Sequence, residues 1–232
     1  MTPRRLLGLL PLLPTLWAGA VAAAPTSYIA QAGAYNFCPT DSQTGTAPTT
    51  ASLDCNVIGG SGPTYFGQVS SRARADAGEL GVGARASSSG SYVAVAGGAY
   101  AAIEGLPVTF SWVGPGPAPT GLFSASLNLE LDGEMGIESL SFPNASGVEL
   151  IFQAFLGNGS SLGLYRYAEL ANGIVQRSPN FAAISGIEAE GSVVRRVFDL
   201  DFTTAPFQFT LGAPVELMLS LTVGVTGSQN IA

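Results

Sequence analysis

The chain contains no histidine and no lysine, and all nine of its basic residues are arginine. Imidazole is the usual base of Ser-His-Asp triads and the commonest zinc ligand, so His-dependent triads and His-based zinc sites are excluded. Only 11% of the residues are charged, and salt bridges are therefore not expected to hold the fold together. The formal net charge of −7 provides no electrostatic attraction for nucleic acid or anionic lipid, so neither is expected as a partner.

The residues that are abundant are small or apolar. Hydrophobic residues make up 47% of the 232 residues, with 30 glycines and 15 prolines. A chain of this length can bury one sizeable core, and all-β domains of this size are commonly single. We expect one domain whose surface consists mainly of Ser, Thr, Ala, Gly and Asn.

Residues 1–23 have the three parts of a secretory signal peptide. Arg4 and Arg5 precede an apolar run from Leu6 to about Trp17, and small residues follow. A membrane anchor is the alternative, but the two prolines in the run and the Ala-rich end favour cleavage. We expect Ala22 or Ala23 to be the last residue removed. Membrane contact is expected only through this segment or through a C-terminal tail beyond the sequence.

Residues 24–64 are rich in Thr, Ser, Pro, Ala and Gly and contain both cysteines, Cys38 and Cys55. In an exported protein, two cysteines most simply form a disulfide. Closing this ring contributes about 3 kcal/mol on the chain-entropy model. The alternative is a reactive thiol or a metal-binding pair, but no His or third Cys completes such a site. We predict a loop-rich N-terminal segment held by a disulfide, and no cofactor.

The remainder, residues 65–232, reads as strands. From Gln68 to Ile103, small residues alternate at period two, and three glycines at 78, 81 and 83 would each cost about 1 kcal/mol in a helix. The flexible-linker alternative is disfavoured by the recurring Tyr, Val and Ile residues. From Gly121 to Glu134, apolar residues alternate with polar ones, which predicts a strand with one buried face. The apolar residues of that face are Phe123, Ala125, Leu127, Leu129 and Leu131.

Short connections join the later apolar runs, which include 148–156, 162–170, 192–202, 207–211 and 215–225. Repeated short connections favour an all-β, antiparallel two-layer β-sandwich of the jelly-roll or Ig-like kind. Little or no helix is expected after the signal peptide, the best candidate being a short one at 179–184. The last run ends at Ala232 without a turn, and we expect the parent chain to continue with a further strand.

Four stretches resemble, in their residue composition and pattern, exported bacterial proteins of the PEP-CTERM, exosortase-sorted kind. The stretches are Glu79–Ser91, Val108–Trp112, Asn128–Gly133 and Phe209–Val225; the C-terminal Pro-Glu-Pro motif of that group is not in this chain. The resemblance implies a protein of the bacterial cell envelope or extracellular surface. Its partners would be extracellular polysaccharide or other copies of itself.

Glu130, Asp132 and Glu134 form an E-x-D-x-E run. On an extended strand the three carboxylates share one face and cannot share a pKa, since like charges raise at least one of them. The spacing resembles the catalytic strand of glycoside hydrolase family 16, which implies a retaining β-glycosidase with Glu130 as nucleophile, Asp132 as orienting carboxylate and Glu134 as acid/base. Asp-Gly is also a hairpin-turn signal. The favoured interpretation is a solvated strand end that enters a turn at Asp132–Gly133.

Two further groups have a chemical and a structural interpretation. Asp199 and Asp201 would contribute to a calcium site if the fold brought them to Asp132 or Glu134. The sequence contains no EF-hand motif, however, and the favoured interpretation is that both are strand residues that face solvent. Tyr165 and Tyr167 share one strand face and can stack on a sugar ring, although core aromatics are favoured.

Taken together, the sequence predicts a non-catalytic exported envelope or extracellular matrix protein. The alternative is a carbohydrate-active protein, either a lectin-like module or a retaining β-glycosidase that uses Glu130 and Glu134. Neither function depends on a cofactor.

Overall fold

The computed structural model describes residues 18–34, 38–59, 65–76, 79–89, 93–138, 147–170, 175–177, 187–190 and 193–229. These residues form strands and turns and no helix, so none of them provides a helical span across a membrane. The short helix expected at 179–184 and the first 17 residues of the predicted signal peptide lie outside the described residues.

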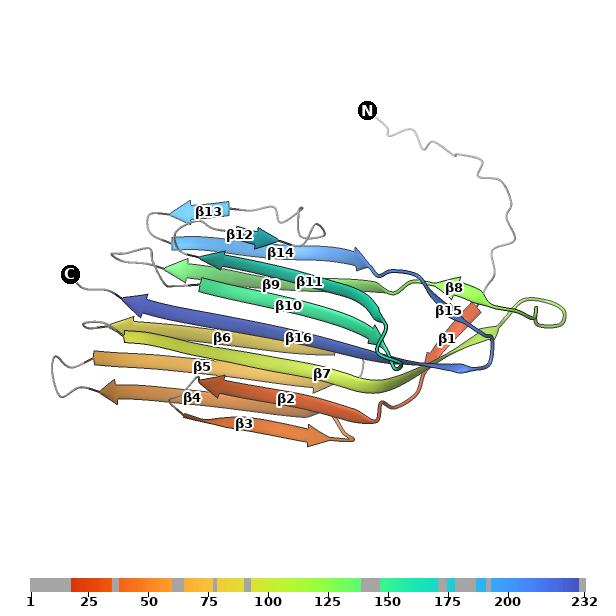
Figure 1. Cartoon of the computed structure of the whole chain (residues 1–232), viewed down its shortest axis with the longest axis horizontal. Coiled ribbons are helices and arrows are strands. Elements are labelled where there is room, and N and C mark those ends of the chain that lie inside the picture. Colours follow the sequence, from red (N-terminus) through yellow and green to blue (C-terminus); the bar gives the residue numbers. More distant parts are fainter. Residues whose placement is uncertain are drawn as a thin grey trace, which may run out of the picture.

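One layer of the molecule is a large antiparallel sheet, and its strands run along the long axis of the protein (Figure 1). In spatial order its strands are β12 (Val175–Arg177), β11 (Ser161–Leu170), β10 (Gly147–Leu156), β16 (Pro214–Gln229), β7 (Val93–Trp112), β2 (Ser27–Ala34) and β3 (Cys38–Gly45). Strand β1 (Ala18–Ala22) lies beside the far end of β7.

Three smaller antiparallel sheets complete the structure. The first is β4 (Thr49–Gly59), β5 (Tyr65–Asp76) and β6 (Glu79–Ser89); the second is β13 (Ile187–Glu190), β14 (Val193–Thr203) and β9 (Asn128–Glu138); the third pairs β15 (Phe207–Phe209) with β8 (Phe123–Ala125). Residues of all three sheets join the large sheet in one hydrophobic core. The predicted all-β antiparallel sandwich is confirmed.

Alternation at period two builds this core. On β2 and β7 the buried side chains are mostly alanines, whereas β10 and β11 bury larger ones such as Phe152, Tyr165 and Tyr167. Strands place alternate residues on opposite faces, so the intervening polar residues face solvent. The core therefore changes from small side chains beside β3 to aromatic ones beside β12.

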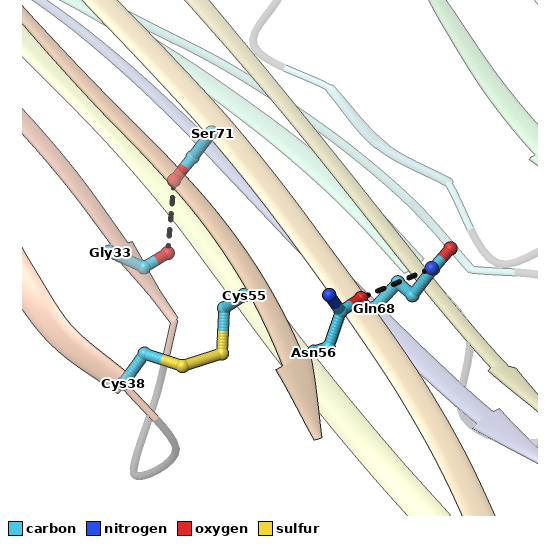
Figure 2. Close-up of a disulfide and its surroundings, with 6 residues drawn as sticks. All are labelled: Gly33, Cys38, Cys55, Asn56, Gln68 and Ser71. Atoms are coloured by element: carbon cyan, nitrogen blue, oxygen red, sulfur yellow. Dashed lines mark hydrogen bonds between the residues drawn. A yellow bond between two sulfur atoms is a disulfide. The ribbon is translucent and has the colours of Figure 1, made fainter. Parts of the chain in front are cut away.

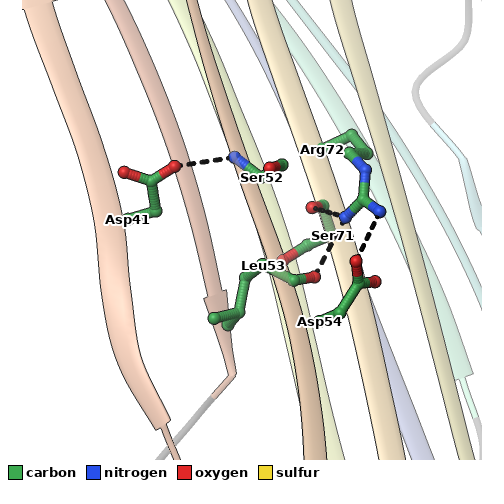
Figure 3. A network of polar contacts seen from close by, with 6 residues as sticks. All are labelled: Asp41, Ser52, Leu53, Asp54, Ser71 and Arg72. Carbon is green, nitrogen blue, oxygen red and sulfur yellow. Dashed lines mark hydrogen bonds and ion pairs between the residues drawn. The ribbon is translucent and has the colours of Figure 1, made fainter.

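The two layers are joined at one edge, between β3 of the large sheet and β4 of the second layer. The predicted disulfide between Cys38 and Cys55 is confirmed there (Figure 2). Nearby, the hydroxyl of Ser71 on β5 donates a hydrogen bond of 3.3 Å to the carbonyl of Gly33 on β2. Asp41 on β3 accepts a 2.8 Å hydrogen bond from the backbone N–H of Ser52 (Figure 3).

The segment 24–64, expected to be rich in loops, instead contains strands β2, β3 and β4. Its Thr and Ser residues alternate with Ala, Leu and Cys, and β4 buries Ala51 and Cys55 while Ser52 and Asp54 face solvent. Polar composition alone suggested loops, but the period of two is that of a half-buried strand.

The strand expected over 121–134 is divided into β8 and β9. Between them, the N–H of Leu127 donates to the hydroxyl of Thr204, and the N–H of Thr204 donates to the carbonyl of Leu127, both at 3.0 Å. These bonds satisfy the backbone where the sheet ladder is interrupted. Leu127, Leu129 and Leu131 still pack against the core and are half-buried.

Candidate functional site

Strand β9 carries the E-x-D-x-E run and continues through Gly133 to Glu138 without a turn. The expected turn at Asp132–Gly133 is therefore wrong. Gly133 pairs with Phe198 of β14, and Asp132 pairs with Asp199. A full antiparallel partner keeps the backbone extended, because its ladder of hydrogen bonds outweighs the local preference of Asp-Gly for a hairpin.

The pairing of β9 with β14 places the positions of both predicted sets of acidic residues on one face of the sheet. Glu130, Asp132 and Glu134 alternate along an extended strand, and such positions share a face. Asp201 lies opposite Glu130, and Asp199 lies opposite Asp132. Opposed residues of an antiparallel pair also share a face. Strand positions about 70 residues apart in the sequence thus lie on one face of the β9–β14 pair, and we call these five positions the carboxylate face.

At Glu130 and Asp201 the carboxylate face is turned away from the core. Glu130 and Asp201 are exposed, while Leu129 and Leu131 on the opposite side of β9 pack against the core. Like charges directly opposite each other disfavour strand pairing, although solvent and salt screen them. Among the side chains that the structure describes, no three Asp, Glu, His or Cys form a group able to hold a metal ion.

The glycosidase resemblance depends on how far apart Glu130 and Glu134 lie. Along an extended strand four residues span about 14 Å between Cα atoms. A retaining glycosidase needs its two carboxyl groups only about 5 to 5.5 Å apart. The backbone positions of residues 130 and 134 are therefore much farther apart than the carboxyl groups of a retaining glycosidase.

Tyr165 and Tyr167 are core residues, as the favoured interpretation held. Both are buried on β11, and the ring of Tyr165 packs against that of Phe202 with 4.6 Å between ring centroids. The hydroxyl of Tyr167 donates a hydrogen bond to the carboxylate of Glu169, which is also buried. These rings join the two layers and offer no exposed surface for stacking on a sugar.

A groove of about 830 Å³ lies on the outer face of the large sheet. Three of the glycines that line it come from three adjacent strands and stand in cross-strand register: Gly33 on β2 pairs with Gly98 on β7, and Gly98 pairs with Gly224 on β16. The next strand places Glu149 opposite Gly224. The glycines thus form a floor that crosses the strands.

Of these three glycines, Gly224 differs most clearly from Gly97, which faces the second layer; a Cβ added at Gly98 would lie 3.0 Å from the carbonyl oxygen of Val223, and one at Gly33 would lie 3.3 Å from the hydroxyl of Thr40. A Cβ added at Gly97 would clash with Cγ1 of Val69 on β5, so packing between the layers requires glycine there. A Cβ added at Gly224 would meet no atom within 4 Å. Glycine weakens a strand interior and often marks a site where a ligand approaches closely. Packing does not explain the glycine at position 224.

Polar and aromatic side chains line the groove beside this floor. On one side, Gln31, Tyr100 and Thr222 occupy the adjacent cross-strand row. Arg166 on β11 continues that same row, since it pairs with Ile151, which pairs with Thr222. The side chain of Arg166 forms an ion pair with Glu149 of the floor row. These two are the charged groups among the described residues that line the groove, and because they pair with each other the lining is neutral overall.

Tyr100 is the aromatic residue among the described residues that line the groove, and its phenol stays uncharged. Burial raises the pKa of its phenol above the ordinary value of 10.0, and the negative charge of Glu104 raises it further. A hydrogen bond with Ser220 opposes this shift. The half-buried ring is therefore a neutral surface at physiological pH, with its hydroxyl held near Ser220.

Sequence reasoning did not find the groove. Its glycines come from runs that were correctly predicted as strands, but their alignment depends on which strands pair and in which register. The one signal was the Gly97-Gly98 pair inside an apolar run, since glycine is disfavoured in strand interiors. The carboxylates that the sequence did single out lie on β9 and β14, in the other layer.

In comparisons with known proteins, no family model, no curated protein and no solved structure matches the chain.

Proposed function

We propose that the protein is an exported, non-catalytic β-sandwich of the bacterial cell envelope or extracellular matrix. The observation that carries the proposal is the disulfide between Cys38 and Cys55, which joins the edge strands of the two layers. Disulfides form and persist in oxidising compartments outside the cytosol. The signal-like residues 1–23 agree with this location.

The chemistry of the groove favours binding over catalysis. Hydrolysis of a glycosidic bond by the usual mechanism needs two carboxyl groups beside the scissile bond. Glu149 is the carboxylate among the described lining residues, and Arg166 neutralises it. Such a lining suits holding a ligand in place.

Localisation tests the proposal. The whole chain, with a C-terminal tag, is produced in a Gram-negative bacterium, and the cells are fractionated. We expect a protein that begins at Ala23 or Ala24 outside the cytoplasm, with Cys38 and Cys55 protected from alkylation until a reductant is added. Mass spectrometry checks both points. A full-length, reduced protein in the cytosol would contradict the proposal.

The second candidate function is a retaining β-glycosidase on the carboxylate face. The uninterrupted strand β9 supports it, because positions 130 and 134 of an extended strand lie on the same face. Release of reducing ends from a β-glucan or a galactan, abolished by both Glu130→Gln and Glu134→Gln, would establish this activity. Asp201→Asn is the matched control, since Asp201 lies opposite Glu130 without a role in that mechanism.

A further inference from the structure

We infer that the groove on the outer face of the large sheet binds a neutral glycan chain, which lies across strands β2, β7, β16 and β10. The inference deepens the proposed function: it names the polymer that an envelope or matrix protein would hold. It is independent of where the protein is found, because the binding site is complete in the purified chain.

The shape of the groove suits an extended, flat ligand. Its glycine floor crosses three strands, and Glu149 on a fourth strand continues the same row. At a strand spacing of about 4.8 Å, four strands span about 14 Å. That length accommodates a few sugar rings in a row.

The groove lies on the face of the sheet and not at an edge. Strands β2, β7, β16 and β10 each have a hydrogen-bonded neighbour on both sides. A peptide cannot add to them as a further strand, because their backbone groups are already used in the ladder. Recognition must come from side chains that point out of the sheet.

Those side chains match the two kinds of surface on a sugar ring. Tyr100 offers an aromatic face, which packs well against flat apolar surface. Gln31, Thr222 and Thr226 offer amide and hydroxyl groups that both donate and accept hydrogen bonds. An apolar lining with a few polar groups is the usual composition of a small-molecule site.

Charge selects a neutral glycan over an acidic one. Glu149 and Arg166 neutralise each other within the groove, so no unpaired charge attracts an ionic ligand. The whole chain carries a formal charge of −7, which repels nucleic acids and polyanionic polysaccharides.

The test uses the whole protein purified from the expression host, from whichever cell fraction contains it. Binding is measured by isothermal titration calorimetry with cellohexaose, xylohexaose and mannohexaose as neutral probes and a polygalacturonate hexamer as the anionic probe. We expect at least one neutral hexasaccharide to bind and the anionic hexamer not to bind. Failure of all three neutral probes, or binding of the anionic one alone, would overturn the inference.

The variant Gly224→Val tests whether the glycan binds in the groove. The substitution fills the floor, and its Cβ meets no atom within 4 Å, so the fold should accept it. We expect an unchanged melting temperature and the loss of binding. Gly83→Val on β6 is the matched control, because a Cβ there also meets nothing within 4 Å and lies in the other layer. Equal binding by both variants would overturn the inference.

Tyr100 supplies the second test. Tyr100→Ala removes the aromatic face, and we expect the dissociation constant to rise about tenfold, as for the loss of one aromatic contact. Tyr100→Phe keeps the ring and should bind within a few-fold of the native protein. If Tyr100→Ala binds as tightly as the native protein, Tyr100 does not contact the ligand and the proposed mode of binding fails.

Discussion

The two halves of the second layer pack on the same large sheet by different means. The first half, β4–β5–β6, lies over the alanines of β2 and β7 and is joined to β3 by the disulfide. The second half, β9–β14, brings Phe202 against Tyr165 of β11. Small side chains bury little apolar area, so the first half depends on close approach and a covalent link. The second half depends on the area of its rings.

The largest expected effect is the loss of an aromatic ring from the second half. Phe202 is only 4% exposed, and replacing it with alanine should lower the free energy of unfolding by about 3 to 5 kcal/mol through lost burial and the remaining cavity. Urea denaturation followed by circular dichroism measures it. Leu122→Ala is the control, since Leu122 is 70% exposed and should change stability by less than about 0.5 kcal/mol.

The next effect concerns the covalent link of the first half. Replacing both Cys38 and Cys55 with serine should cost about 3 kcal/mol, because the unfolded chain is no longer restrained. The native protein in the presence of a reductant should show the same loss. Should the double variant be as stable as the oxidised protein, the disulfide would not be what secures this half.

The close approach of the two layers in the first half predicts a smaller loss of stability. Gly97→Ala places a Cβ against Val69, and the resulting overpacking should cost about 1 to 3 kcal/mol. Gly83→Ala, also in a strand but with open space around it, should be neutral or slightly stabilising. The difference between the two variants in one denaturation series isolates the packing of the layers from the general effect of replacing glycine.

The smallest effect is a pH dependence at the edge where β3 meets β4. The N–H of Ser52 lowers the pKa of Asp41 below its ordinary value of 3.8, and Gln43 lowers it further. A carboxyl group whose pKa is lowered in the folded state stabilises the fold at pH values above its ordinary pKa. This stability is lost as the pH falls through the lowered pKa. Asp41→Asn should therefore flatten the acid side of the stability profile. An unchanged profile between pH 5 and about 2 would show that this hydrogen bond does not form in solution.

The outcome at Asp132–Gly133 shows why local signals were insufficient. Asp-Gly favours a hairpin turn in an isolated segment, but here β14 pairs with β9 along its whole length. The partner strand begins 60 residues later, and no local pattern reveals which strand it will meet. In the same way, residues 24–64 have a loop-like composition, yet three strands of the sandwich form there.

The sequence by itself determined the all-β class, the disulfide and the core-facing side of the segment 121–134, because alternation at period two and two cysteines in a polar segment are local properties. Only the tertiary structure decided that three glycines would align into a groove and that carboxylates of β9 and β14 would share a face. Both arrangements depend on the register between strands distant in the chain. That register follows from the packing of the whole sandwich, which no single segment encodes.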